Sequence, residues 1–375
     1  MAKNIGRKIF SILIICALLY VFLVSISLMG HALKGFGRGF AEKLIQTTSN
    51  PFVALFIGIL ATSIIQSSST VTSIVVGMVS SGALTVSGAI PIVMGANIGT
   101  SVTNTLVSFG HVTRKEEFKR AFSSALIHDI FNVSCVVILF PLEMMTHVLE
   151  RTARLLSGMV TTSSAFKFTS PLKVALKPTI KFFDNVFQVW LSIPEKASYI
   201  LMLVLSLMLL FAALFFIVKV MRSMVIQRTE IVFNKVLGRS GVFGIMMGAL
   251  FTAIVQSSSV TTSLMVPLAA SGVVTLEQIM PITLGANLGT TITAILASLA
   301  GNEAGVTIAF VHLLFNTLGI MIFYPFKHTR QMILREARAL GEVSIKSRKY
   351  AFLYVMTIFF IIPFTMIFLS KICTR

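Results

Sequence analysis

Two identical polar motifs interrupt an apolar chain: Gln-Ser-Ser-Ser occupies residues 66–69 and again residues 256–259. Each motif supplies three hydroxyl groups and a carboxamide beside the expected first turn of a helix, whose free N–H groups attract anions. Neither motif contains a lysine or an arginine, so an anion held there at low dielectric is costly unless cations bind with it. The two motifs therefore predict sites for an anion accompanied by mobile cations.

A second polar motif follows the first in both places. Residues 91–100 and 281–290 share the pattern Pro-Ile-x-x-Gly-Ala-Asn-x-Gly-Thr. The neutral oxygens of Asn, Gln, Ser and Thr suit a hard cation such as sodium. Glycine and asparagine also lower helix propensity, so we expect the surrounding helix to break here in both copies. The expected breaks comprise Gly95, Asn97, Gly99, Gly285, Asn287 and Gly289.

A carboxylate lies in a third motif, His-Asp-Ile-Phe-Asn at residues 128–132. Asp129 is the only acidic residue well inside an apolar stretch, and a carboxylate at membrane depth is costly and usually functional. The second copy of this motif has Leu313 at the same position. We therefore expect the first copy to carry one additional cation site, formed by Asp129 and Asn132. The alternative is a protonated or backbone-paired aspartate with a packing role.

Packing is also the alternative for the other polar residues. Small hydroxylated side chains are common where membrane helices touch, and His128 and His312 are either satisfied packing residues or members of a polar network. However, residues 58–108 align with residues 248–298 without a gap, and roughly half of these positions are identical. Two copies of the motifs in the same order favour a binding site over a packing role.

The composition of the chain fixes its class. Of the 375 residues, 55% are hydrophobic and 12% are charged, and the mean hydropathy of +0.91 indicates a polytopic membrane protein. The formal net charge of +18 does not indicate nucleic-acid binding, because the basic residues cluster in short connections between apolar stretches. The three cysteines have no metal or redox spacing and are expected to be reduced packing residues. The chain lacks paired carboxylates, an activated nucleophile and a Walker loop, so neither enzyme activity nor an organic cofactor is expected.

The elements that position these motifs follow from segment length. The apolar stretches beside each Gln-Ser-Ser-Ser motif are about fifteen residues long, too short for a bilayer core that needs about twenty. Two half-length helices that meet at a polar tip predict a re-entrant hairpin, at residues 52–81 and 242–271. Full helices are expected at residues 9–31, 120–147, 197–221, 306–326 and 350–370, and broken helices at residues 86–109 and 276–299.

The expected fold is an all-α polytopic membrane protein with two inverted repeats, at residues 1–147 and 197–326. Residues 148–196 form a long connection with interfacial helical pieces, and residues 327–375 form a basic loop and a C-terminal helix. The first apolar run is too long for a signal peptide and follows three basic residues, so a transmembrane helix with a cytoplasmic N-terminus is expected. Seven crossings would place Lys371 and Arg375 outside, which the positive-inside rule disfavours, so the side of the C-terminus stays open.

With these motifs in this order, the chain resembles the type II sodium-dependent phosphate cotransporters. That family carries two inverted repeats, each with Gln-Ser-Ser-Ser followed by Gly-x-Asn-x-Gly-Thr, and a His-Asp-x-Phe-Asn segment ahead of Pro-Leu-Glu, here residues 141–143. The resemblance covers nearly the whole chain. It departs at residues 148–196, which lack the disulfide-forming cysteines of relatives with a large extracellular loop.

The resemblance implies a multi-pass carrier of the cell membrane that couples sodium entry to the uptake of inorganic phosphate. Phosphate is expected between the two tips, on Ser67, Ser68, Ser69, Ser257, Ser258 and Ser259. One sodium ion is expected on Gln256, Ser257, Thr290 and Thr293, an equivalent one on Gln66, Ser67, Thr100 and Thr103, and a third near Asp129 and Asn132. In the family, an aspartate at position 129 accompanies electrogenic transport, so three sodium ions per hydrogen phosphate are expected.

The residues leave two alternatives open: a symporter for another oxyanion and, in a different class, an anion channel or a membrane scaffold. A symporter for sulfate or arsenate would share this donor set, and uptake of labelled anions with and without sodium separates it from a phosphate carrier. An anion channel would pass current without sodium coupling, and a membrane scaffold would tolerate the loss of Gln66 and Gln256. The expected partners are phosphate, sodium and the lipid bilayer, without nucleic acid.

Overall fold

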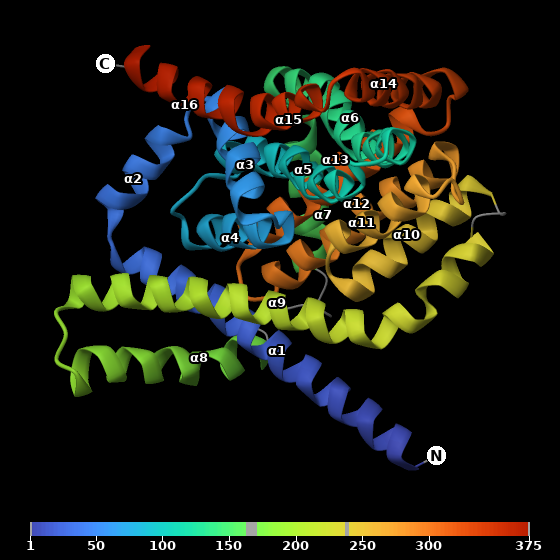
Figure 1. Ribbon diagram of the computed structural model, residues 1–375. Coiled ribbons are helices and arrows are strands. Elements are labelled where there is room, and N and C mark those ends of the chain that lie inside the picture. The colour runs from blue at the N-terminus through green and yellow to red at the C-terminus, as the bar shows by residue number, and fades with distance from the viewer. Residues whose placement is uncertain (1, 163–170, 237–239, 374–375) are drawn as a thin grey trace.

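Helices dominate the computed structural model, which describes residues 2–162, 171–236 and 240–373 (Figure 1). Within these residues, seven helical spans are long and apolar enough to cross a bilayer. They belong to α1 (Ala2–Gly35), α5 (Val86–Ser108), α6 (Lys115–Thr146), α9 (Glu195–Val236), α12 (Leu276–Ser298), α13 (Glu303–Phe323), and α15 (Arg348–Met356), which continues through η4 (Thr357–Ile361) into α16 (Ile362–Cys373). The chain is therefore an all-α multi-pass membrane protein, as the sequence predicts.

Four shorter helices form the two expected pairs. They are α3 (Pro51–Ile65) with α4 (Ser68–Ser81), and α10 (Gly241–Val255) with α11 (Ser258–Ala270). None of the four reaches the length of a span, which confirms the half-length helices predicted around the Gln-Ser-Ser-Ser motifs. The chain enters the first pair from α2 (Arg38–Thr47), which meets α3 at an angle of 93°.

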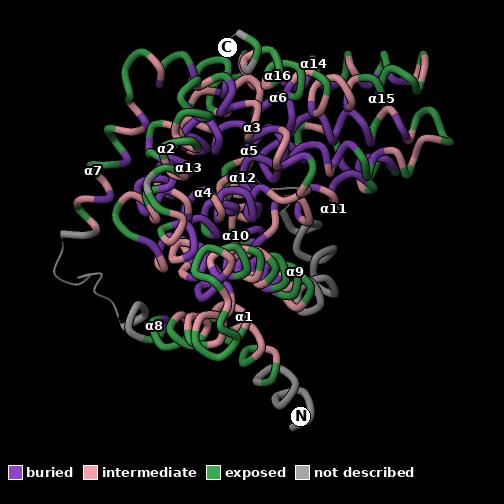
Figure 2. The backbone as a smooth tube through the Cα atoms, turned by 90° about the vertical axis from the view of Figure 1, so that its left-hand side faces the viewer, coloured by how far each residue is buried: buried purple, intermediate pink, exposed green. Residues whose placement is uncertain are grey.

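The core is built by the two copies together. Helices α5 and α12 are the most buried of the candidate spans, and each packs along the first helix of its own pair, α3 or α10. The second helix of each pair reaches the other copy, because α4 contacts α12 and α13 while α11 contacts α5 and α6. Figure 2 shows the buried residues at this centre, whereas α1, α8 and α9 expose much of their surface. The polar motifs are therefore held at the junction of the two copies.

The predicted helix breaks are wrong. Helix α5 runs without interruption through Gly95 and Gly99, and α12 does the same through the equivalent glycines. The glycines instead allow close approach, since a Cβ at Gly95 would lie 2.0 Å from the Leu55 carbonyl oxygen, and one at Gly285 would lie 2.0 Å from that of Ile245. Small residues let helix backbones pack tightly in membranes. That packing with α3 and α10 offsets the low helix propensity on which the prediction rested.

Two segments expected to be connections are also helical. Residues 327–349 were predicted as a loop, but α14 (Lys327–Lys346) is an amphipathic helix that buries Ile333, Leu334 and Ala337 and packs along α6. Helix α9 likewise continues past residue 221 to Val236. The long connection contains α7 (Val148–Thr162), α8 (Pro171–Asp184) and η3 (Asn185–Trp190), in agreement with the expected helical pieces. In Figure 1, α14 to α16 lie on the opposite side of the molecule from α1 and α8.

Candidate functional site

Both tips have the same backbone geometry. Gln66 and Gln256 end their helices in the left-handed conformation, with φ angles of 61° and 59°. A non-glycine residue rarely adopts this conformation, and the strain of about 1–3 kcal/mol is often found at ligand sites. Ser67 and Ser257 then begin the next helix, and their hydroxyls accept the N–H groups of Thr70 and Val260. The tip is therefore a fresh helix N-terminus in each copy, as predicted.

Each tip glutamine is held by a threonine of the following long helix. The Thr103 hydroxyl donates to Gln66 Oε1 at 2.9 Å, and the Thr293 hydroxyl donates to Gln256 Oε1 at 2.8 Å. The amide nitrogens of both glutamines donate to backbone carbonyls three residues earlier, at 2.5 Å. The structure thus brings together the glutamine and one threonine of each sodium site expected from the resemblance.

The remaining predicted ligands lie near these pairs without bonding to them. Thr100 and Thr290 donate to the carbonyls of Ala96 and Ala286 in their own helices, and they share a helix face with Thr103 and Thr293. Their lone pairs remain available to accept. Ser68, Ser69 and Ser258 are buried, whereas Ser67, Ser257 and Ser259 are partly exposed. Among the described residues no hydrogen bond joins the Ser67–Ser69 tip directly to the Ser257–Ser259 tip.

A buried network links the two copies beneath the tips. His128 Nε2 lies 2.5 Å from Oδ1 of Asn287, and Asn287 Nδ2 donates to Oδ1 of Asn132 at 2.6 Å. Asn132 in turn donates to the carbonyl of Asn97 at 2.8 Å, and Asn104 Nδ2 lies 3.1 Å from Nδ1 of His128. Because an amide nitrogen can only donate, Nδ1 of His128 accepts and its Nε2–H donates to Asn287. The network interpretation of the histidines is confirmed, and Asn97 and Asn287 are its junctions.

The network has two halves of unequal completeness. In the other half, His312 Nε2 lies 3.3 Å from Oδ1 of Asn97, and Asn316 donates to the carbonyl of Asn287 at 3.2 Å. Here Asn97 Nδ2 bonds within its own helix, to the Val93 carbonyl, and not to Asn316. Asn316 Oδ1 is therefore buried without a partner, and His312 Nδ1 is also without one, because Ala294 stands where the first copy has Asn104. We call the His128 half of the network closed, because its side chains are hydrogen-bonded, and the His312 half open, because two of its atoms have no partner.

Asp129 is fully buried and only half satisfied. The Tyr354 hydroxyl donates to its Oδ2, and the Ser101 side chain lies next to the carboxylate. The other oxygen, Oδ1, is buried without a hydrogen-bond partner. No ion pair among the described residues involves Asp129. A buried carboxylate without a partner is costly unless a proton or a cation binds to it, which fits the expected additional site. Asn132 is committed to the network at both ends, so its role as a ligand of that cation stays a prediction.

Sequence reasoning missed two residues of this region. Asn104 accepts from Thr262 at 2.8 Å and from Ser263 at 3.1 Å, which ties α5 to α11. Its equivalent in the second copy is Ala294, and this difference was the available signal. The second missed residue, Tyr354, lies outside the repeats, so no comparison of the two copies could find it.

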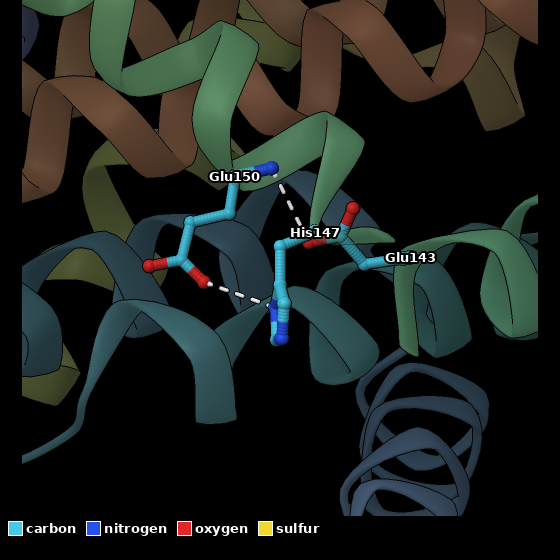
Figure 3. Close-up of side chains that lie close together, drawn as sticks. All are labelled: Glu143, His147 and Glu150. Carbon is cyan, nitrogen blue, oxygen red and sulfur yellow. Dashed lines mark hydrogen bonds and ion pairs between the residues drawn. The ribbon is translucent and has the colours of Figure 1, made fainter. Parts of the chain in front are cut away.

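The Pro-Leu-Glu segment has a structural role. Glu143, His147 and Glu150 bring their ligand atoms within 4.8 Å of one another (Figure 3). However, both oxygens of Glu143 accept backbone N–H groups, from Leu149 at 2.6 Å and from Glu150 at 3.2 Å. Arg154 holds Glu150 through two bonds to one oxygen. With His147 in the left-handed conformation, this cluster ends α6 and caps α7.

Comparison with known proteins gives consistent results. A sequence profile described as Na+/Pi-cotransporter matches residues 21–168 and 191–347. Sodium-dependent phosphate transport protein 2B of Homo sapiens is 35% identical over an alignment that is 458 residues long with its gaps and covers 98% of this chain and 66% of that protein. Sodium-dependent phosphate transport protein 2A of Rattus norvegicus is 33% identical, over 96% of this chain and 68% of that protein. The chain thus spans about two thirds of the length of these relatives. No solved structure gives a significant match.

Proposed function

Because this chain belongs to the Na+/Pi-cotransporter family, we propose that it is a secondary active transporter in which sodium entry drives the uptake of inorganic phosphate. The observation that carries the proposal is the pair of equivalent tips, each with a left-handed glutamine held by a threonine and followed by a serine-capped helix. Such a tip offers carboxamide and hydroxyl oxygens to a cation and helix N–H groups to an anion. Both ligands can therefore bind side by side.

The proposed phosphate site comprises the serines of the two tips. Ser67 to Ser69 and Ser257 to Ser259 stand at the first turns of α4 and α11, where unpaired backbone donors and the helix dipole favour a negative charge. The printed sequence places no lysine or arginine in either tip, so the dianion has no fixed counter-charge there. Sodium ions provide it, which makes phosphate binding depend on sodium and couples the two fluxes.

Two sodium sites are proposed on equivalent residues. Gln66 and Thr103 would hold one ion, and Gln256 and Thr293 the other, with Thr100, Thr290 and the first serine of each tip completing the ligand sets. In both pairs the glutamine oxygen already faces the threonine hydroxyl, so a bound ion replaces one hydrogen bond and needs little rearrangement. This preorganisation supports the assignment.

A third sodium ion is proposed at Asp129. The unpartnered Oδ1 is the donor that supports it, and Tyr354 orients the carboxylate by donating to the other oxygen. With hydrogen phosphate at −2, three sodium ions at +3 and an ionised Asp129 at −1, the loaded carrier is neutral. The empty carrier returns with the aspartate charge, so each cycle moves one positive charge inward.

The two copies are proposed to be inverted across the membrane and to alternate between two states. The difference between the two halves of the network supports this proposal. Asn287 and Asn97 are equivalent residues, but their side-chain amides bond to different partners. In the opposite state, Asn97 Nδ2 would leave the Val93 carbonyl and bond to Asn316. Rocking between such states exposes the midplane site to each side in turn.

Tracer uptake by the purified protein in liposomes tests the substrate. We expect radiolabelled phosphate to enter when sodium is outside and not when potassium replaces it. Radiolabelled arsenate and sulfate are then tested under the same two conditions, and phosphate should be the preferred anion. Sodium-dependent uptake of sulfate without uptake of phosphate would assign the chain to another oxyanion. Equal uptake in sodium and potassium would contradict coupling.

A further inference from the structure

A charged cavity lies away from the tips, between α1, α4, α8 and the turn that joins α12 to α13. It has a volume of about 490 Å³, and Lys34, Lys177 and Lys181 line it. Asp184 is the one acidic residue of its lining, and this carboxylate is already engaged by His31 at 2.9 Å. With three lysines and one carboxylate the lining carries a net positive charge, and no ion pair among the described residues engages these lysines.

The wall of the cavity is mostly apolar. Ile26 of α1 and Leu176 and Ile180 of α8 contribute to it, and the Ser80 hydroxyl, also in the lining, is buried without a hydrogen-bond partner. A single inorganic anion would fill only a small part of this volume and would leave the apolar wall uncovered. The lining instead suits a molecule with an anionic group at one end and hydrocarbon at the other.

The cavity lies at the end of two candidate spans. Lys34 is in the last turn of α1, whose apolar span ends at Gly35, and the span of α9 begins at Glu195. Between α8 and α9, Trp190 is 68% exposed and Leu191 is 59% exposed, as expected for residues at the boundary between hydrocarbon and water. Tyr20 bonds to the Ala175 carbonyl and Thr179, which holds α8 along α1 (Figure 1). The Lys34 end of the cavity thus lies at the level of lipid head groups, and its Ile26 end lies deeper along the α1 span.

We propose that this cavity binds an anionic phospholipid, with Lys34, Lys177 and Lys181 on its phosphate group and the apolar wall against its acyl chains. Three lysines beside hydrocarbon are costly without a counter-charge, and a lipid phosphate supplies one. The bound lipid bridges α1, α8 and the end of α4, and it takes no part in sodium or phosphate binding.

Native mass spectrometry of the purified full-length protein tests this proposal. The protein is equilibrated in a neutral detergent, without sodium, with short-chain phosphatidylglycerol or phosphatidylcholine of the same chain length. We expect phosphatidylglycerol to be retained in preference to phosphatidylcholine. Each lysine near a lipid phosphate contributes about a 5-fold gain in affinity, so Lys177→Gln with Lys181→Gln should weaken binding about 30-fold.

The matched control is Lys346→Gln with Lys349→Gln, which removes the same charge from the other side of the molecule and should leave retention unchanged. If the Lys177 and Lys181 variant elutes as an aggregate, Lys34→Gln alone should still weaken retention about 5-fold. Equal retention of the two lipids, or an equal effect of the control variant, would overturn the proposal. Displacement of phosphatidylglycerol by inorganic phosphate at equal concentration would assign the cavity to a soluble anion and would also overturn it.

Discussion

His128 Nε2 lies 2.5 Å from Oδ1 of Asn287, whereas its equivalent, His312 Nε2, lies 3.3 Å from Oδ1 of Asn97. Both contacts cross from one copy of the repeat to the other, and both are buried. The first belongs to a chain of hydrogen bonds that satisfies both ends of His128 and Asn287. In the second copy His312 Nδ1 has no partner, because Ala294 stands where the first copy has Asn104. The two copies are therefore joined at their centre by equivalent residues that have different hydrogen-bond partners.

This difference predicts unequal effects of two equivalent substitutions. His128→Ala leaves Oδ1 of Asn287 and the amide of Asn104 unsatisfied in the core, at a cost of about 1–3 kcal/mol for each orphaned group. His312→Ala removes one long hydrogen bond and should cost less. Thermal unfolding of the two variants in the same detergent measures this, with His128→Ala expected to have the lower midpoint. Equal midpoints would show that the two halves are equally bonded in solution.

Loss of a threonine that bonds to a tip glutamine should weaken sodium binding. Thr293→Val keeps the branched shape of the side chain but removes the hydroxyl that faces Gln256 Oε1. Loss of one cation ligand should raise the sodium concentration for half-maximal uptake about tenfold, with a smaller effect on that for phosphate. Thr103→Val should behave in the same way. Thr317→Val, whose hydroxyl bonds only within its own helix, is the control. A selective loss of phosphate affinity would reassign these threonines to the anion.

The close approach of α10 and α12 should make Gly285 intolerant of a methyl group. An alanine Cβ there would lie 2.0 Å from the Ile245 carbonyl oxygen, so the helices must separate, at a cost of about 1–3 kcal/mol or more. Gly158 in α7 has open space at this position, and alanine there should stabilise the helix by about 0.5–1 kcal/mol. Unfolding midpoints of both variants check the pair. An unchanged midpoint in Gly285→Ala would show that the contact is looser than the structure has it.

Asp129 should set the charge that is moved in each cycle. In Asp129→Gly the carboxylate and its sodium ion disappear together, so two sodium ions balance hydrogen phosphate and uptake should continue without current. The wild-type protein gains about 2.3 kcal/mol per 100 mV from the single charge that it moves. Phosphate-evoked current, recorded together with tracer uptake at a fixed potential, measures the charge per phosphate. The same ratio in Asp129→Gly would leave Asp129 with the packing role considered above.

Sequence patterns predicted the helical class, the spans and the two tips because each depends on local information. Segment length separates a span from a half-length helix, and Gln66 with Ser67 carries both the end of one helix and the cap of the next. The continuity of α5 could not be predicted in this way, because Gly95 is stabilised by a contact with the backbone of α3, forty residues away in the chain. Asn97 was also predicted to break the helix because of its low helix propensity. Its side chain instead belongs to the network between the copies, which the sequence alone does not show. Tyr354 needed the tertiary structure, which brings the last helix beside Asp129.

The most direct test of sodium-driven transport is accumulation against a gradient. Liposomes that contain the protein start with equal phosphate on both sides and sodium only outside, with the potential held at zero by potassium and valinomycin. The internal phosphate concentration should rise above the external one in wild type and in Gln46→Ala, an exposed glutamine of α2. It should not rise in Gln66→Ala or Gln256→Ala, which lose the tip carboxamides. Two results would contradict a sodium-coupled carrier built on these tips. One is an internal phosphate concentration that stays equal to the external one in wild type, and the other is accumulation that persists in both tip variants.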